Sequence, residues 1–199
     1  MLRKLLGSEY NIISYVKPNA RLHEVVSSVD HLTRDFNSED VVIVLGGTND
    51  VQQSVPYQLT LARSAKLLLP LQNRCRTIFC SIPHRHDQPS LNCHIDVANF
   101  CLLQTFISMS LNNFVWLNLN VLNREHFTRH GLHLNKQGKH SLCTTINNLL
   151  TKGKLFKKEL SISSTISSYS RHSFGVPAPL QGRPNNSFLS RTPHQLFLT

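Results

Sequence analysis

The sequence predicts an α/β protein in which helices cover a mostly parallel β-sheet. Short apolar segments alternate along the chain with longer segments of helical periodicity. The clearest apolar segment, Val41–Leu45, contains no polar residue, as a strand buried on both faces requires. The chain has 199 residues, of which 40% are hydrophobic, and this is enough for the core of one such domain.

The N-terminal part is expected to hold two strands and two helices. Residues 10–16 are rich in β-branched and aromatic side chains and predict a strand, and Val41–Leu45 is the second. Residues 21–36 predict an amphipathic helix, because apolar residues recur there every three or four positions. Residues 56–71 predict another helix, whose inward-facing side chains are expected to be Leu59, Ala62, Leu67 and Leu71.

The following part of the chain repeats this alternation. Residues 77–82 and 114–119 predict two more strands, and residues 92–111 predict a long helix between them. A last helix is expected from about residue 135 to residue 150, with Asn135 as its N-cap. Because the predicted strands alternate with helices, they should form a parallel sheet, and right-handed crossovers then place the carboxyl end of every strand at one edge.

The composition changes after this helix and predicts a division into two regions. Residues 1–154 form the expected domain, and residues 155–199 form a basic, Ser- and Pro-rich tail that we expect to be disordered. Residues 151–199 carry seven Lys or Arg and one acidic residue, so they contribute most of the net charge of +10. Such a tail can bind nucleic acid through phosphates, or it can serve as a solvated end.

The cysteines and the hydropathy of the sequence indicate the cellular compartment in which the protein is expected. The five cysteines have no paired close spacing and no CxxC motif, which favours reduced thiols in an intracellular, cytoplasmic protein. No apolar run approaches the length of a membrane span, and the apolar stretch near Met1 is too short for a signal peptide. No cofactor is expected.

Three polar loops follow predicted strands and should meet at one edge of the sheet. They are residues 46–50 (GGTND), residues 83–87 (PHRHD) and residues 126–135 (HFTRHGLHLN). The carboxyl ends of parallel strands share an edge, where ligands of such sheets bind. The first loop alone is equally well explained as an ordinary turn, since turns favour Gly, Asn and Asp.

Two of these motifs, taken in order, resemble motifs of the SGNH hydrolases, also called GDSL-type esterases. That family has a G-x-N-D motif, matched here by residues 47–50, and a later D-x-x-H motif, matched by residues 130–133. The runs SIPHRHD and HFTRHGLHLNKQGK look especially like the SGNH-type domains of arthropod genomes, often within transposon-related sequences. The resemblance covers about residues 10–150 and implies a flavodoxin-like, three-layer α/β/α fold.

The resemblance also implies a role for individual residues. In the family, a Ser attacks an ester carbonyl, a His takes its proton, and an Asp three residues earlier orients that His. His133 matches the base, Asn49 matches a side chain that holds the oxyanion, and His130 stands where the family has Asp. The residues expected to line the substrate site are Gly47, Thr48, Asp50 and Asn19. In the family, a glycine stands at the position of Asn19, and its backbone N–H helps to hold the oxyanion.

The nucleophile is expected to be absent. The family's Ser follows the first strand, whereas Ser8 follows a short helical segment, so we do not assign Ser8 this role. The first strand, which would lie at the centre of the sheet, is expected to be missing. The strand at residues 10–16 should then pair directly with the strand Val41–Leu45. Otherwise, each of these two strands should have one unpaired edge. The chain is therefore expected to be an impaired or non-catalytic fragment of an ester hydrolase with an unknown substrate.

Other interpretations remain for the histidines and for the chain. His126, His130 and His133 could bind zinc, although Gly131 disturbs their presentation on a helix. As part of the last motif, His126 is instead a solvated loop residue. The loop of residues 83–87 also contains histidines. Its residues His84, His86 and Asp87 could line the same edge of the sheet, or they could form an ordinary polar loop. The alternative function is a basic, nucleic-acid-associated accessory module of a transposon-derived protein, although the sequence has no signature of a known nucleic-acid-binding module.

Overall fold

Five parallel strands flanked by helices form the structure, a computed structural model that describes residues 2–6, 10–51, 57–110, 113–151 and 194–198. The strands are β1 (Tyr10–Ser14), β2 (Val41–Leu45), β3 (Arg76–Cys80), β4 (Phe114–Leu117) and β5 (His194–Leu198). Their order across the sheet is β1-β5-β2-β3-β4, and every neighbouring pair is parallel. The predicted α/β class with a parallel sheet is confirmed.

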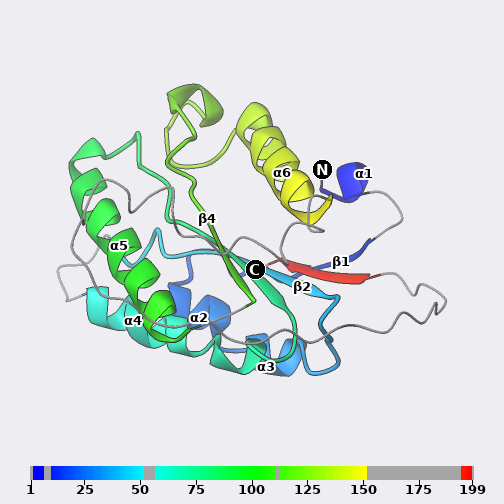
Figure 1. Ribbon diagram of the computed structural model, residues 1–199. Coiled ribbons are helices and arrows are strands. Elements are labelled where there is room, and N and C mark those ends of the chain that lie inside the picture. Colours follow the sequence, from blue (N-terminus) through cyan, green and yellow to red (C-terminus); the bar gives the residue numbers. More distant parts are fainter. Residues whose placement is uncertain (1, 7–9, 52–56, 111–112, 152–193, 199) are drawn as a thin grey trace, which may run out of the picture.

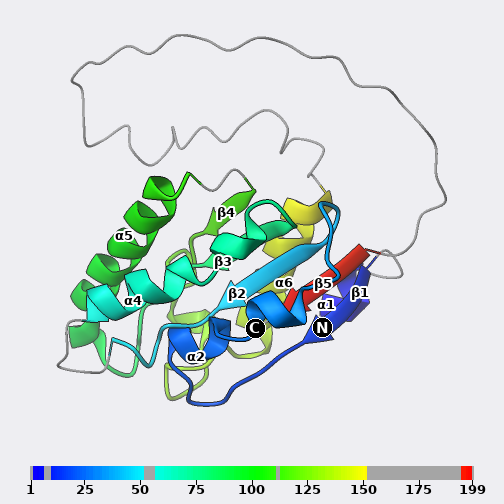
Figure 2. The ribbon, with the colours of Figure 1, turned by 90° about the horizontal axis from the view of Figure 1, so that it is seen from below.

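Helices lie on both faces of this sheet (Figures 1 and 2). One face carries α2 (Leu22–Val26), α3 (Val29–Leu32), α4 (Tyr57–Lys66) and α5 (Asn92–Ser108), and the other carries α1 (Leu2–Leu6) and α6 (Lys136–Thr151). Three short 3₁₀ helices complete the described elements: η1 (Leu69–Leu71), η2 (Pro89–Leu91) and η3 (Arg124–His126).

The core is divided by the sheet into two apolar clusters. Along β2, Val42 and Val44 belong to the cluster on the α2–α5 side, which we call the first core cluster. Val41 and Ile43 belong to the cluster on the α1 and α6 side, the second core cluster. All four side chains are buried, because successive residues of a strand point to opposite faces and both faces are covered. This explains why the β2 sequence is continuously apolar.

The helix predicted over residues 21–36 is divided into α2 and α3. The break falls at Ser27 and Ser28, where the Ser27 hydroxyl donates a hydrogen bond to the backbone oxygen of Glu24 at 3.0 Å. Such local side-chain bonds compete with helical ones. The apolar periodicity continues across the break, since Val26 and Val29 are both buried, and this is why the sequence suggests one helix.

The prediction of the inward face of residues 56–71 was wrong at two positions. Leu59 is 53% exposed and Leu67 is 43% exposed. The buried stripe of α4 and the turn after it consists instead of Leu61, Ser64, Ala65 and Leu68. Ser64 can lie in this stripe because its hydroxyl donates to the backbone oxygen of Thr60 at 2.8 Å. Because Ser64 is polar, the apolar pattern of the sequence did not indicate the helix face that is buried.

Strand β5 lies in the tail of the chain, which we expected to be disordered. His194–Leu198 lies in the region expected to lack structure, yet it forms a strand between β1 and β2. The expectation does not hold for these five residues, and residues 152–193 lie outside the described part of the chain. The expected alternatives for β1, direct pairing with β2 or an unpaired edge, were also wrong, because β5 occupies the position between them.

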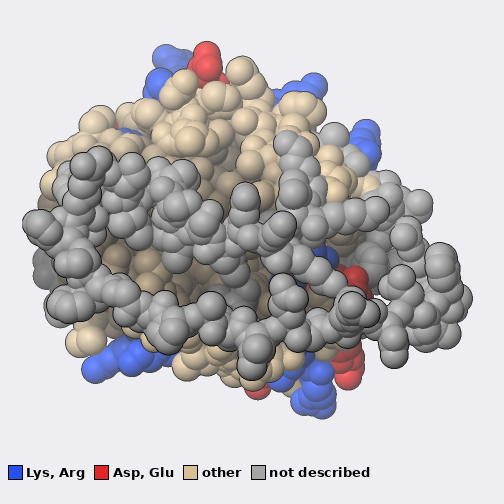
Figure 3. Space-filling model, in the orientation of Figure 1, with Lys and Arg blue, Asp and Glu red and all other residues tan. Residues whose placement is uncertain are grey.

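None of the helices in the described part of the chain has the length and apolar character needed to cross a membrane. Charged side chains are spread over the surface that Figure 3 shows. On this face, the Lys and Arg side chains of the described residues lie at separate places around the rim, several of them beside Asp or Glu.

Candidate functional site

The candidate site lies where strands β1 to β4 end, along one edge of the sheet. The loops that follow these strands are residues 15–21, 46–51, 81–91 and 118–135. Because all strands are parallel, the loops share the carboxyl edge. The structure therefore places the GGTND and HFTRHGLHLN segments at the same edge of the sheet, as predicted.

The loop after β2 turns sharply at Gly47. Gly47 has a φ of +99°, and the Asp50 N–H donates to the Gly47 oxygen at 3.1 Å. A Cβ atom at this position would lie 2.8 Å from the Ile82 side chain, so the glycine also lets this loop pack against the loop after β3. Gly47 is buried, which indicates a packing role for a residue that we expected at the substrate site.

Asn49 binds the loop after β1, and Asp50 binds the start of α2. The Asn49 side-chain amide donates to the backbone oxygen of Ala20 at 3.0 Å, and Asp50 Oδ2 accepts the Leu22 N–H at 2.8 Å. Asp50 thereby holds the first residue of α2. Its buried Oδ1 has no hydrogen-bond partner among the described residues. Burial raises the pKa of the Asp50 carboxyl, while the bond from Leu22 acts in the opposite direction.

Asn19 and Thr48 are the remaining residues expected to line the site. Asn19 is exposed and has a φ of +59°, a conformation that Asn tolerates better than most residues. Thr48 is half-buried. Ser8, to which we assigned no catalytic role, lies outside the described residues.

The loop after β3 is fixed by two asparagines of α5. The buried Asn99 amide accepts the Ile82 N–H and donates to the Ile82 oxygen, both at 2.8 Å, so it binds both backbone groups of the second residue after β3. Asn92 Oδ1 accepts the Arg85 N–H at 2.8 Å. Arg85 forms a two-pronged ion pair with Asp87, and this contact is the main reason why the pKa of Asp87 is lowered.

The loop after β3 in turn holds the histidine-rich loop. The His86 N–H donates to the Gly131 oxygen at 3.0 Å, and the His86 ring lies edge-on to Phe127 with centroids 4.6 Å apart. Gly131 has a φ of +81°, and a Cβ there would lie 2.7 Å from the Asp87 nitrogen. Burial lowers the pKa of His86. Contacts thus run from the GGTND loop through residues 81–87 to residues 126–135.

Asn135 organises the end of the histidine-rich loop. Its side chain donates to the backbone oxygens of Glu125 and Phe127 and accepts the Gly138 N–H at 2.9 Å. The last bond confirms Asn135 as the N-cap of α6. Gly138 allows η3 to approach this helix, because a Cβ on Gly138 would lie only 2.1 Å from the His126 oxygen.

The three histidines of this loop have different surroundings. His126 is half-buried, and its Nδ1 accepts the Asn123 N–H at 3.1 Å. His130 and His133 are exposed, and neither ring forms a hydrogen bond or an ion pair within the described part of the chain. Among the described residues, no group of three or more His, Cys, Asp or Glu is placed to hold a metal ion. The zinc interpretation of these histidines is therefore not supported.

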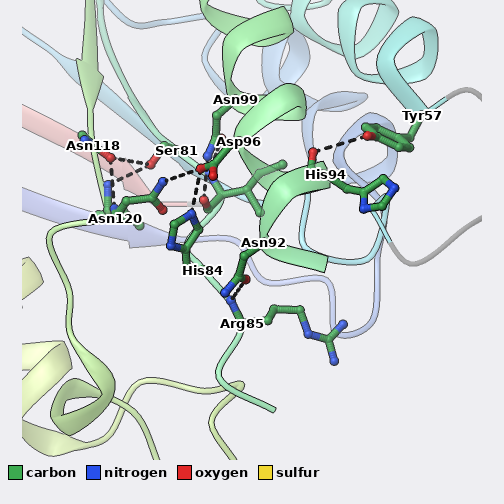
Figure 4. A network of polar contacts seen from close by, with 12 residues as sticks. Tyr57, Ser81, His84, Arg85, Asn92, His94, Asp96, Asn99, Asn118 and Asn120 are labelled. Carbon is green, nitrogen blue, oxygen red and sulfur yellow. Dashed lines mark hydrogen bonds and ion pairs between the residues drawn. The ribbon is translucent and has the colours of Figure 1, made fainter. Parts of the chain in front are cut away.

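A histidine–carboxylate pair does occur at this edge, between residues that we did not pair from the sequence. His84 Nε2 lies 2.7 Å from Asp96 Oδ1, and the Asn120 side chain donates to the same oxygen at 3.2 Å (Figure 4). His84 follows β3, Asp96 lies on α5 and Asn120 follows β4, so only the fold brings them together. Both partners are partly exposed, with 31% of the His84 side chain and 56% of the Asp96 side chain accessible.

Ser81 lies beside this pair but is used in the structure of the sheet. Its side chain is buried, and its Oγ accepts the Leu119 N–H at 2.7 Å (Figure 4). The hydroxyl also lies 3.5 Å from Asn118 Oδ1. These contacts connect the ends of β3 and β4, and they direct the hydroxyl toward Asn118 rather than toward an exposed histidine.

Comparisons of the chain with models of protein families, with curated proteins and with solved structures found no match in any of the three.

Proposed function

We propose that this chain is an SGNH-hydrolase-type domain with a flavodoxin-like, three-layer α/β/α arrangement that no longer hydrolyses esters. The parallel sheet with helices on both faces supports the fold. Its strand order also agrees with a doubly wound sheet of order 2-1-3-4-5, provided that β5 takes the place of the first strand. The positions of residues 47–50 after β2 and residues 130–133 after β4 support the resemblance to the family motifs.

The observation that carries the loss of activity is the environment of His133. In the Ser-His-Asp triad a carboxylate fixes the tautomer of the catalytic imidazole and stabilises the imidazolium. His130 stands at the position of that carboxylate, and an imidazole cannot supply the negative charge. Among the described residues, no carboxylate bonds either ring. The one His–carboxylate pair of these loops joins His84 to Asp96 instead.

The oxyanion position is only partly preserved. Asn49 has two amide hydrogens, and one of them is engaged by the Ala20 oxygen. The other could bind an ester or carboxylate oxygen, and each such donor can contribute about 10²–10³ to a rate when a nucleophile is present. If the nucleophile is absent, as the sequence predicts, the same donor supports binding of an oxygen ligand but not turnover.

Hydrolysis of p-nitrophenyl acetate by the whole chain tests this proposal. We expect a slow rate that does not saturate with substrate and that is the same in His133→Ala and in His140→Ala, which removes an exposed histidine of α6. A fluorophosphonate should label no Ser. Saturable turnover that is abolished in His133→Ala but kept in His140→Ala, together with one labelled Ser, would show that the chain is an active hydrolase.

A further inference from the structure

Strand β5 makes two hydrogen-bonding ladders at once. It pairs with β1 over five residues, from Tyr10↔His194 to Ser14↔Leu198, and with β2 over three, from Val41↔Leu196 to Ile43↔Leu198. A strand added at the edge of a sheet makes only one such ladder. The space between β1 and β2, which we call the strand slot, therefore offers an entering strand two rows of backbone donors and acceptors.

Buried apolar residues of both β1 and β2 flank the strand slot on one face of the sheet, whereas on the other face only β2 supplies one, because Asn11 and Ile13 of β1 are exposed. Ile12 of β1 and Val41 and Ile43 of β2 belong to the second core cluster, and Val42 belongs to the first. A strand that fits between them should be apolar at consecutive positions. Residues 196–198 of β5 have the sequence Leu-Phe-Leu, which meets this requirement.

The connection of β5 to the rest of the chain differs from that of the other strands. Residues 152–193, a segment of 42 residues, separate it from the end of α6. The remaining strands are each followed by a helix that packs on the sheet. In both views of the molecule β5 lies between β1 and β2 (Figures 1 and 2). It is thus the one described strand that is inserted between elements from a distant part of the sequence.

Strand β1 depends on this insertion. Among the described strands β5 is its only neighbour, and Ile12 is its only buried side chain. Strand β2 keeps β3 as a partner on its other edge. Removing β5 would separate β1 from the sheet and open one edge of β2 while leaving the β2-β3-β4 ladders intact.

We propose that the strand slot is a binding site for a parallel, apolar β-strand, and that its occupant, β5, can be exchanged for the same strand of a second copy of this chain. Recognition is by backbone ladders on both sides and by the apolar side chains of the flanking strands, which is the chemistry of β-strand addition. The identical strand of a second copy satisfies every one of these requirements.

The test uses a fluorescent peptide with the sequence of residues 191–199 and the full chain carrying Leu196→Pro. Proline removes one N–H and cannot join a central ladder, so the variant should present an open slot. We expect saturable binding of the peptide to this variant, measured by fluorescence anisotropy. We expect no binding when the peptide itself carries Leu196→Pro.

The unchanged chain provides the matched comparison. A tethered strand competes at an effective concentration on the order of millimolar. If the peptide binds the open slot with a micromolar Kd, its apparent affinity for the unchanged chain should be about 10³-fold weaker. Equal binding to both chains would place the peptide elsewhere and overturn the proposal, as would the absence of binding to a folded Leu196→Pro chain. If the Leu196→Pro chain is unfolded, we expect the unchanged peptide to restore a cooperative thermal transition and the proline-containing peptide to have no such effect. If the unchanged peptide does not restore the transition, the proposal is also overturned.

Discussion

At the scale of single residues, Gly138 shows how a contact reverses an intrinsic preference. In a helix interior, replacing Gly by Ala normally stabilises by about 1 kcal/mol. Here the added Cβ would lie 2.1 Å from the His126 backbone oxygen, so η3 and α6 would have to separate. That movement would strain the cap formed by Asn135.

We therefore expect Gly138→Ala to lower the free energy of unfolding by about 1–3 kcal/mol, the range of overpacked sites. Urea unfolding measures the change. The control is Gln137→Ala, an exposed neighbour in the same helix, which should change stability by less than about 0.5 kcal/mol. A stabilised Gly138→Ala protein would mean that η3 and α6 do not approach each other as described.

Asp50 gives a pH dependence of definite sign. Burial raises its pKa, so the folded chain holds this proton more tightly than the unfolded chain does. The stability that Asp50 contributes is present below the pKa of an exposed Asp, about 4, and is lost as the pH rises through the raised value. The side chain of Asp50→Asn does not ionise in this pH range, and its amide oxygen can still accept the Leu22 N–H.

The free energy of unfolding of Asp50→Asn, relative to the unchanged chain, should therefore increase between pH 4 and pH 7. Other ionisable groups cancel in this difference, provided that both proteins are measured at each pH. Denaturant unfolding at several pH values gives the comparison. A difference that stays constant with pH would mean that folding leaves the pKa of Asp50 unchanged, and a difference that falls would mean that folding stabilises the ionised carboxylate.

The same residues mark the limit of what the sequence reveals about the site. The G-x-N-D motif identifies a loop at the carboxyl edge, which is where residues 47–50 lie. Motif matching cannot show that Asp50 is bound to the Leu22 amide, because that partner lies 28 residues away and is chosen by packing. His84 and Asp96 likewise belong to different elements. A sequence gives residue types and spacing, whereas such pairs follow from the positions of whole strands and helices.

At the scale of elements, prediction succeeded where one periodicity dominates. Strand β2 is a continuous apolar run, and it is found over the predicted residues Val41–Leu45. Helix α6 has its cap at Asn135, which the sequence marks clearly. In contrast, α4 buries Ser64 and exposes Leu59, because a local hydrogen bond to Thr60 satisfies the serine. Hydrophobic periodicity does not contain that information.

Strand β5 is the element that the sequence concealed most fully. Five residues are too few for a reliable alternation pattern, and a Pro- and Ser-rich segment precedes them. Nothing local distinguishes these residues from a tail. Their strand conformation depends on β1 and β2, which supply both ladders from residues more than 150 positions earlier. Such an element is set by tertiary structure rather than by local preference.

At the scale of the whole molecule, the sheet consists of two parts with different support. Strands β2 and β3 are buried between helices on both faces and share a five-residue ladder. Strand β1 has one buried side chain and is held to the sheet through β5. Regions with few buried apolar contacts open at lower free energy than the core. The β1-β5 part should therefore open before β2-β3-β4.

Native-state hydrogen exchange of the full chain tests this order. We expect the amides of residues 10–14 to exchange through openings of lower free energy than those of residues 41–44 and 77–80, because separating β5 from β2 breaks three residue pairs and leaves the β2-β3 ladder intact. In Leu196→Pro, protection of residues 10–14 should fall to that of an unfolded segment, while residues 77–80 remain protected by β2 and β4. Loss of protection in all strands together would mean that β5 is an inseparable part of one cooperative sheet. Unchanged protection of residues 10–14 in Leu196→Pro would mean that β1 does not rely on β5 at all.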